Sequence, residues 1–166
     1  KNLWILTAEG KVGIFNTKNF RFREAAVKLK SKESLRSSIK RLVMDELGNI
    51  FYLLAGGEVV TWNETRNEFS YTYNFFSVPA GKGIADFAHQ PGTNKYWISV
   101  QGEGIAIYDH STRHLSYPWP DAPKEMNAEH IRKVAGAYNI HFDKKGKVWF
   151  QRWGAGYPEI YCYDLR

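Results

Sequence analysis

Cysteine is almost absent from this chain of 166 residues, which contains Cys162 alone. A single cysteine cannot form an intramolecular disulfide, and it excludes a zinc site built on several cysteine ligands. No run approaches 18 uninterrupted apolar residues, so the sequence predicts no membrane-spanning helix. The chain begins at Lys1 without a signal-peptide pattern. We therefore expect a processed or excised segment whose compartment has to be inferred from other features.

Acidic residues are outnumbered, because 23 Lys and Arg face 17 Asp and Glu, for a net charge of +6. The excess lies between Lys18 and Arg41, where nine basic residues meet only Glu24 and Glu33, so the rest of the chain carries about −1. A basic patch can bind nucleic acid or an anionic surface. No nucleic-acid-binding motif accompanies this one, and a solvated strand-and-loop region is the favoured interpretation. The aromatic share of 16% argues against a disordered chain.

One pattern of aromatic residues occurs four times along the chain. The anchor aromatics are spaced 47, 46 and 52 residues apart, and in three copies a second aromatic follows 11 residues later and an apolar residue 7 after that. In the fourth copy the second aromatic arrives slightly later, at Tyr161 or Tyr163. The anchors are Trp4, Phe51, Trp97 and Trp149; the second aromatics are Phe15, Trp62 and Tyr108; the third positions are Phe22, Phe69 and Leu115.

Glycine- and Asp/Asn-rich turns separate these positions and predict four strands per unit, joined by hairpins. In the second unit the predicted strands are 39–45, 49–55, 58–63 and 68–75, and in the third they are 84–89, 95–101, 105–109 and 114–117. A period of 40–50 residues with four strands is typical of a β-propeller blade. A β-sandwich is the alternative, but it gives no reason for the 11- and 7-residue intervals to recur.

The predicted fold is therefore all-β: a β-propeller fragment of about three and a half to four four-stranded antiparallel blades, with units at about 1–37, 38–83, 84–137 and 138–166. The first unit starts at its second strand and the last ends after its third. The four anchors are expected in the core between blades. Such a fragment exposes apolar blade faces, so we expect it to pack against the remaining blades of its own propeller or to form a homo-oligomer.

The repeat resembles the two-component-regulator propeller repeat. The residues that carry the resemblance are Asn2–Thr7 with Ile14–Asn16 in the first copy, Tyr108–Asp109 in the third and Asp143–Trp149 in the fourth. Phe51 stands where the pattern has Trp. The resemblance implies the extracytoplasmic, periplasmic sensor region of a hybrid two-component system histidine kinase, an inner-membrane protein that often responds to oligosaccharides. No kinase motif is present in this sequence, so the segment itself is expected to be non-catalytic.

Ligand contacts in propellers fall on loops between strands two and three and between blades. Among the loops between strands two and three, 152–158 is the longest. The connector 118–138 is long for a connection between blades. Within that connector we predict a short helix at 123–134. Trp, Tyr and Arg on loops suit sugar stacking or a protein hot spot. The candidate ligand-binding residues are Arg152, Trp153, Tyr157, Trp119, His130 and Tyr138.

Two other classes of function remain open from the sequence. A propeller-based carbohydrate-active enzyme or lyase would need convergent acid and base groups, but the loop carboxylates and His130 are dispersed among blades. A protein-interaction scaffold would need no such groups. The five histidines have no metal-ligand spacing, so neither a metal nor a cofactor is expected. Asp45, Asp109 and Asp143 sit at predicted turns, where we expect them to cap the turns.

Overall fold

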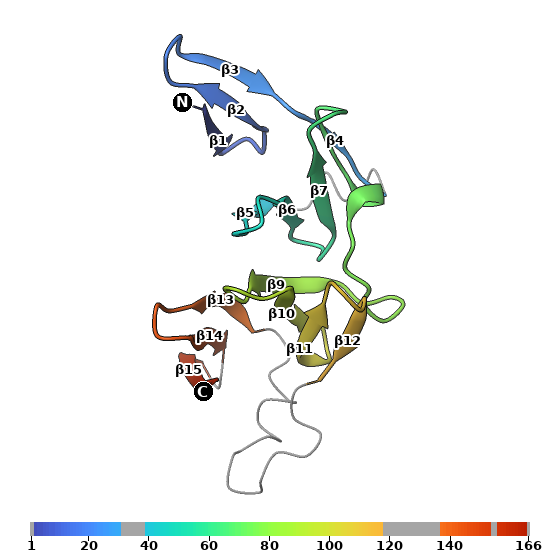
Figure 1. Cartoon of the computed structure of the whole chain (residues 1–166), viewed down its shortest axis with the longest axis vertical. Coiled ribbons are helices and arrows are strands. Elements are labelled where there is room, and N and C mark those ends of the chain that lie inside the picture. Colours follow the sequence, from blue (N-terminus) through green and yellow to red (C-terminus); the bar gives the residue numbers. More distant parts are fainter. Residues whose placement is uncertain (1, 31–38, 118–136, 154–155, 166) are drawn as a thin grey trace, which may run out of the picture. The chain divides into compact units, whose positions relative to one another are not determined.

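The computed structural model describes residues 2–30, 39–117, 137–153 and 156–165 (Figure 1). The chain forms two compact units, Lys1–Asn74 and Phe75–Arg166. Strands dominate both units, and the described helical structure is one short 3-10 turn, η2 (Tyr71–Tyr73). The predicted helix at 123–134 lies outside the described residues.

The first sheet has three antiparallel strands in chain order, β1 (Asn2–Leu6), β2 (Val12–Asn16) and β3 (Arg21–Glu24). Trp4 pairs with Ile14, and Leu3 pairs with Phe15, which in turn pairs with Phe22. Because side chains alternate along a strand, Trp4 and Leu3 point to opposite faces of this sheet.

The second sheet contains five strands in the order β4-β8-β7-β6-β5. Its bounds are β4 (Ala26–Lys28), β5 (Ile39–Met44), β6 (Ile50–Leu54), β7 (Val59–Asn63) and β8 (Glu68–Ser70). Strand β4 lies in the last part of the first predicted unit, where the repeat predicts no strand. It pairs in parallel with β8 and so covers the outer edge of the sheet, an edge that would otherwise expose its backbone groups.

An ion pair joins the added strand to its neighbour. Lys28 Nζ lies 2.7 Å from Glu68 Oε2. This contact, with a weaker hydrogen bond donated by the Tyr73 hydroxyl, lowers the pKa of Glu68. The predicted fourth strand, 68–75, is shorter than expected because the Ser70 hydroxyl accepts a hydrogen bond from the Thr72 amide and starts η2.

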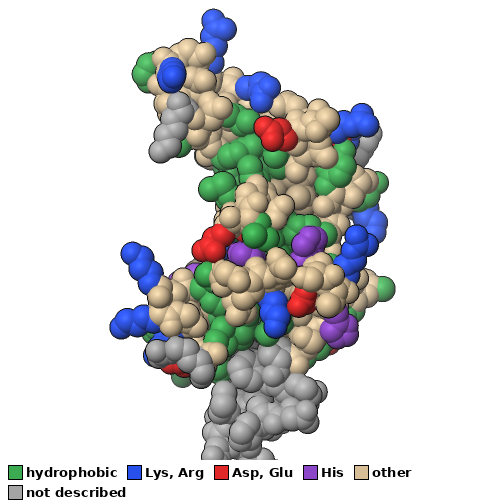
Figure 2. Space-filling model, in the orientation of Figure 1, with side chains coloured by type: hydrophobic (Ala, Val, Ile, Leu, Met, Phe, Trp, Pro, Cys, Tyr) green, Lys and Arg blue, Asp and Glu red, His purple; other side chains and the backbone are tan. Residues whose placement is uncertain are grey.

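Most of the described residues of the basic region are exposed. All four residues of β3 are exposed, and Lys28 is paired with Glu68. Figure 2 shows the Lys and Arg side chains over β1 to β4 standing apart from one another on the visible face. This dispersion agrees with the interpretation of a solvated strand-and-loop region.

Trp4 and Leu6 of the first sheet pack on one face of the second sheet, as an inter-blade anchor should. The ring of Trp4 meets that of Trp62 edge-on at 4.7 Å and that of Phe69 at 5.4 Å. Tyr52 and Leu54 of β6 are buried in the same cluster. Aromatic pairs in this geometry add about 0.5–1.5 kcal/mol each beyond their buried area.

The third sheet is a four-stranded antiparallel meander, and its strands fall where the repeat placed them. They are β9 (Ile84–His89), β10 (Lys95–Val100), β11 (Gly104–Asp109) and β12 (His114–Ser116). Strand β9 has the predicted bounds, and the other three differ from theirs by one residue at one end. The fourth sheet is formed by β13 (Tyr138–Phe142), β14 (Lys147–Trp153) and β15 (Pro158–Asp164).

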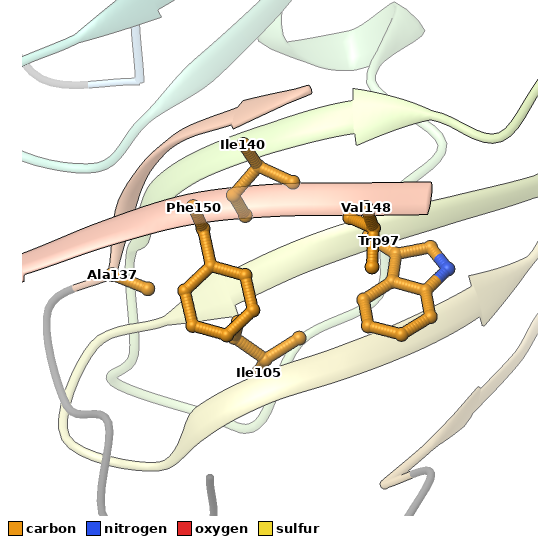
Figure 3. Close-up of a cluster of buried hydrophobic side chains, with 6 residues drawn as sticks. All are labelled: Trp97, Ile105, Ala137, Ile140, Val148 and Phe150. Carbon is orange, nitrogen blue, oxygen red and sulfur yellow. The ribbon is translucent and has the colours of Figure 1, made fainter. Parts of the chain in front are cut away.

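The third and fourth sheets stack face to face. Trp97 and Ile105 of the third sheet are buried against Ile140, Val148 and Phe150 of the fourth. Figure 3 shows the Phe150 ring directed toward Ile105, with Val148 beside the indole of Trp97. A hydrogen bond also crosses this interface, since the Ile140 amide donates to Asp86 Oδ2 at 2.9 Å.

The predicted turn-capping aspartates are confirmed. Asp45 Oδ1 accepts from the Asn49 amide at 2.8 Å, Asp109 Oδ1 from the Ser111 amide at 2.9 Å, and Asp143 Oδ1 from the Lys145 amide at 2.8 Å. Backbone amides of this kind hold the pKa values of Asp109 and Asp143 below their usual range. Four successive sheets of strands that pair antiparallel with their neighbours in the chain, with β4 as an added parallel strand, make the chain a β-propeller fragment.

Candidate functional site

The candidate site lies at one end of the third and fourth sheets, which we call the loop edge: the end at which the second strand of a sheet stops and the third begins. In the fourth sheet this is the end of β14 and the start of β15, with Tyr138 at the start of β13 beside them. In the third sheet it is the turn 101–104, between β10 and β11.

The predicted loop 152–158 is shorter than expected. Arg152 and Trp153 belong to β14, where they pair with Glu159 and Pro158 of β15. The ladder therefore continues up to the glycine-containing tip, and the prediction that these two residues lie on a loop is wrong. Their position at the very end of the hairpin still places Arg152 at the loop edge.

Arg152 takes part in a small polar network. Its Nε lies 3.9 Å from Glu159 Oε2, and the Tyr161 hydroxyl donates to the same carboxylate oxygen at 2.6 Å. The hydrogen bond to Glu159 is the main reason why the pKa of Tyr161 is raised. The carboxylate thus holds a cation and a phenol on the same face of the hairpin, next to the tip.

The other predicted residues are distributed as follows. Tyr157 is 60% exposed at the tip of the hairpin, where its ring is accessible to a ligand. Tyr138 is half-buried and pairs with Gln151 at the start of β13. Only the backbone of Trp153 is described, and Trp119 and His130 lie outside the described residues.

The loop edge of the third sheet carries a second polar group that the sequence did not single out. Lys82 Nζ lies 2.9 Å from Glu103 Oε1, and the Gln101 amide donates to the Gly83 carbonyl at 2.9 Å. Burial, followed by the nearby Glu103 carboxylate, raises the pKa of Tyr117. Lys82 and Glu103 lie in loops on either side of β9 and β10, and Tyr117 follows β12, so only the register of the strands could have indicated that they meet.

The stacked core brings these two groups to the same side of unit 75–166. Ile105 follows the turn 101–104, Phe150 lies two residues before Arg152, and Ala137 precedes Tyr138; all three are buried in one cluster. The loop edge therefore presents tyrosines together with Lys82–Glu103 and Arg152–Glu159. Paired charges and phenolic rings of this kind can donate to hydroxyl groups, accept from them and stack on an apolar sugar face.

Two of the loop carboxylates that the structure describes are engaged in other contacts. Glu58 Oε1 accepts a hydrogen bond from the Lys30 amide at 2.7 Å, and Glu103 is paired with Lys82. Glu9 is exposed, and its pKa is lowered chiefly by a hydrogen bond with Thr7. In the part of the chain that the structure describes, no group of three or more His, Cys, Asp or Glu could hold a metal ion. Nor is any helix there long and apolar enough to cross a membrane.

No family model and no curated protein matches this chain in sequence. Solved structures match it in fold. The extracellular domain of BT3049 from B. thetaiotaomicron, named as a hybrid two-component system, matches 99% of this chain with a TM-score of 0.62 and 13% identity. The extracellular domain of BT4673 from the same organism, named in one structure as a one-component and in another as a hybrid two-component system, matches 89% with a TM-score of 0.57 and 14% identity.

At this level of identity the likeness shows the fold, and it agrees with the blade arrangement derived above. This chain spans about a fifth of each of those neighbours, 20% of BT3049 and 20% of BT4673.

Proposed function

We propose that this chain is a ligand-sensing propeller segment of a two-component system sensor histidine kinase. The segment is non-catalytic, lies in the periplasm, and responds to an oligosaccharide or a similar extracytoplasmic signal. The observation that supports this most is the match over 99% of the chain to an extracellular domain named as part of a hybrid two-component system. The repeat resemblance, found from the residues alone, points in the same direction.

The chemistry of the loop edge supports a hydroxyl-rich ligand. Its charged groups are paired, Lys82 with Glu103 and Arg152 with Glu159. They can form directional hydrogen bonds to a ligand, and because opposite charges lie side by side, the net electrostatic field at the loop edge is weak. Tyr157 adds an exposed ring. A bound ligand would favour one arrangement of blades or protomers over another, and a kinase domain would respond to that shift in population.

The test is binding of defined oligosaccharides, neutral and uronic-acid-containing, to the purified chain, by calorimetry and by the rise in melting temperature. We expect one class of saccharide to bind, and Arg152→Ala and Tyr157→Ala to weaken it. Lys144→Ala is the matched control, because Lys144 is an exposed cation in the turn at the opposite end of the same sheet. If no saccharide binds, or if Lys144→Ala weakens binding as much as Arg152→Ala does, the proposed ligand site is wrong.

A further inference from the structure

The two ion pairs at the loop edge differ in how closely their partners approach. Lys82 Nζ and Glu103 Oε1 are 2.9 Å apart, which is hydrogen-bonding distance. Arg152 Nε and Glu159 Oε2 are 3.9 Å apart, which is too far for a hydrogen bond at that nitrogen. Both side chains of this second pair are partly buried, with 28% of Arg152 and 32% of Glu159 exposed. The Arg152 guanidinium is therefore held loosely by its carboxylate.

The Tyr161 hydroxyl accounts for the open Arg152–Glu159 pair. It donates to the same oxygen, Glu159 Oε2, at 2.6 Å, the short distance of a hydroxyl bound to a carboxylate. The Tyr161 ring is held by stacking on the Phe150 ring, with 5.3 Å between centroids and 13° between planes. Phe150 is buried in the core between the third and fourth sheets. The core thus fixes a hydroxyl on the carboxylate oxygen that faces Arg152.

This group lies on the face of the fourth sheet that packs against the third sheet. Arg152 is opposite Glu159 in the ladder, and the next pair on the same face is Phe150 with Tyr161. Because side chains alternate along a strand, Arg152 shares its face with Phe150, whose ring is directed toward Ile105 of the third sheet (Figure 3). Arg152 therefore lies where the stacked core ends at the loop edge. Both sheets that form this position belong to the described part of the chain.

The guanidinium of Arg152 has donors to spare. It offers five N–H groups in a planar fork. Its partners in the described part of the chain are one carboxylate and one hydroxyl, those of Glu159 and Tyr161. Donors therefore remain for a third group. A second carboxylate fits the planar fork best, because it can accept two parallel hydrogen bonds and carries the opposite charge.

We propose that Arg152 binds the carboxylate of a uronic acid residue, so that the saccharide recognised at the loop edge is an acidic one. This inference rests on the proposed function, because it specifies the class of saccharide that the same site takes. Tyr161 is a positioning residue: by holding Glu159, it leaves the guanidinium open to the ligand. Tyr157 is 60% exposed at the hairpin tip, two residues before Glu159, and offers a ring to the apolar face of a sugar.

Short oligouronates compared with their methyl esters test the contribution of the carboxylate charge. The panel contains galacturonate, glucuronate and mannuronate oligosaccharides, and calorimetry measures their binding to the purified chain. We expect at least one acid to bind about 10- to 100-fold more tightly than its ester, the range that hydrogen bonds between charged groups provide. Arg152→Ala should bring acid and ester to equal affinity. Arg152→Lys, which keeps the charge but loses the fork, should keep only part of the preference.

Two further variants test the positioning role of Tyr161. Tyr161→Phe keeps the ring on Phe150 but frees Glu159 to close on Arg152, so the preference for the acid over the ester should fall. Glu159→Gln removes the competing negative charge, so the preference should rise. In the Glu159→Gln background, Tyr161→Phe should no longer change the preference, because the carboxylate that it releases is absent.

Lys147→Ala is the matched control. Lys147 forms an ion pair of 3.7 Å with Asp164 at the opposite end of the same two strands, so its removal should leave the acid-to-ester ratio unchanged. If Lys147→Ala lowers that ratio as much as Arg152→Ala does, the preference reflects the overall charge of the chain and the assignment to Arg152 is wrong.

The remaining outcomes separate this inference from the proposed function. If esters or neutral saccharides bind as tightly as the acids, the uronate assignment is overturned while saccharide sensing at the loop edge stands. If Tyr161→Phe leaves the acid-to-ester ratio unchanged, the positioning role of Tyr161 is overturned. If no saccharide of either kind binds, the proposed function and this inference are both wrong.

Discussion

Asp86 provides the sharpest test of how the third and fourth sheets are joined. It lies in β9 at 3% exposure, and its Oδ2 accepts a hydrogen bond from the Ile140 amide at 2.9 Å. The pairing of β13 with β14 shifts between Tyr138 and His141, so two residues of β13 face one of β14. A bulge of this kind leaves an amide outside the ladder. Asp86 of the neighbouring sheet satisfies it.

The expected destabilisation follows from the loss of the carboxylate that accepts the Ile140 amide in Asp86→Ala. A hydrogen bond to a charged acceptor contributes about 1.5–3 kcal/mol, and a buried amide without a partner costs about 1–3 kcal/mol. Removing the carboxylate also removes the cost of its own burial, which offsets part of the loss. We expect a net destabilisation of about 2 kcal/mol, which corresponds to roughly 30-fold faster exchange of the Ile140 amide. Asp86→Asn keeps an acceptor oxygen and should lose about half as much or less.

Hydrogen exchange of the Ile140 amide, measured by NMR, reads this contact directly, and urea unfolding gives the free energy. Asp109→Ala is the control, because Asp109 also accepts backbone amides but in an exposed turn of the same unit. It should leave the exchange rate at Ile140 unchanged. If Asp86→Ala also leaves that rate unchanged, or if Asp86→Asn is as damaging as Asp86→Ala, the reasoning fails.

Two further predictions concern the aromatic core. Trp97→Ala should destabilise unit 75–166 by about 3–5 kcal/mol in urea unfolding, because it empties a fully buried site. Trp149→Ala should cost clearly less, because Trp149 is partly exposed, and equal losses would contradict this difference in burial. Burial, reinforced by Tyr161, raises the pKa of Tyr163 to about 12. The folded protein therefore keeps the Tyr163 phenol neutral up to a higher pH than the unfolded chain does. The contribution of this phenol to stability is complete below the unfolded pKa of about 10 and is lost as the pH rises through about 12. An ultraviolet titration should show a phenol that ionises near pH 12 and that Tyr163→Phe removes; retention of that phenol in the variant would assign it to another tyrosine.

Much of the fold could be predicted from the aromatic spacing, because each spacing reports a hairpin of fixed length. Strand β9 has the predicted bounds for this reason. Strand β4 was missed because its three residues, Ala26–Lys28, have no pattern of their own, and their partner β8 is about 40 residues away. Pairing of that kind is set by tertiary context, which strand propensity does not contain.

The candidate site was predictable only in part. The exposed Tyr157 could be found because glycines mark the tip of its hairpin. The sequence predicted that Arg152 lies on a loop, although it belongs to β14. Gly154 and Gly156 indicate a turn, but they do not indicate at which residue the strand pairing ends. The ion pair of Lys82 with Glu103 joins two turns that no motif connects. Proximity across a sheet end depends on register, and register is fixed by the assembled sheet.

The three anchor tryptophans show what a repeat can and cannot specify. Trp4, Trp97 and Trp149 occupy the same position in their strands, and the prediction that such anchors fill the core is confirmed for Trp97 and for the equivalent Phe51. Trp149 has the same register and the same indole hydrogen bond, yet it remains partly exposed. The repeat thus encodes a face that fits another blade, while burial of that face depends on which sheet is placed against it.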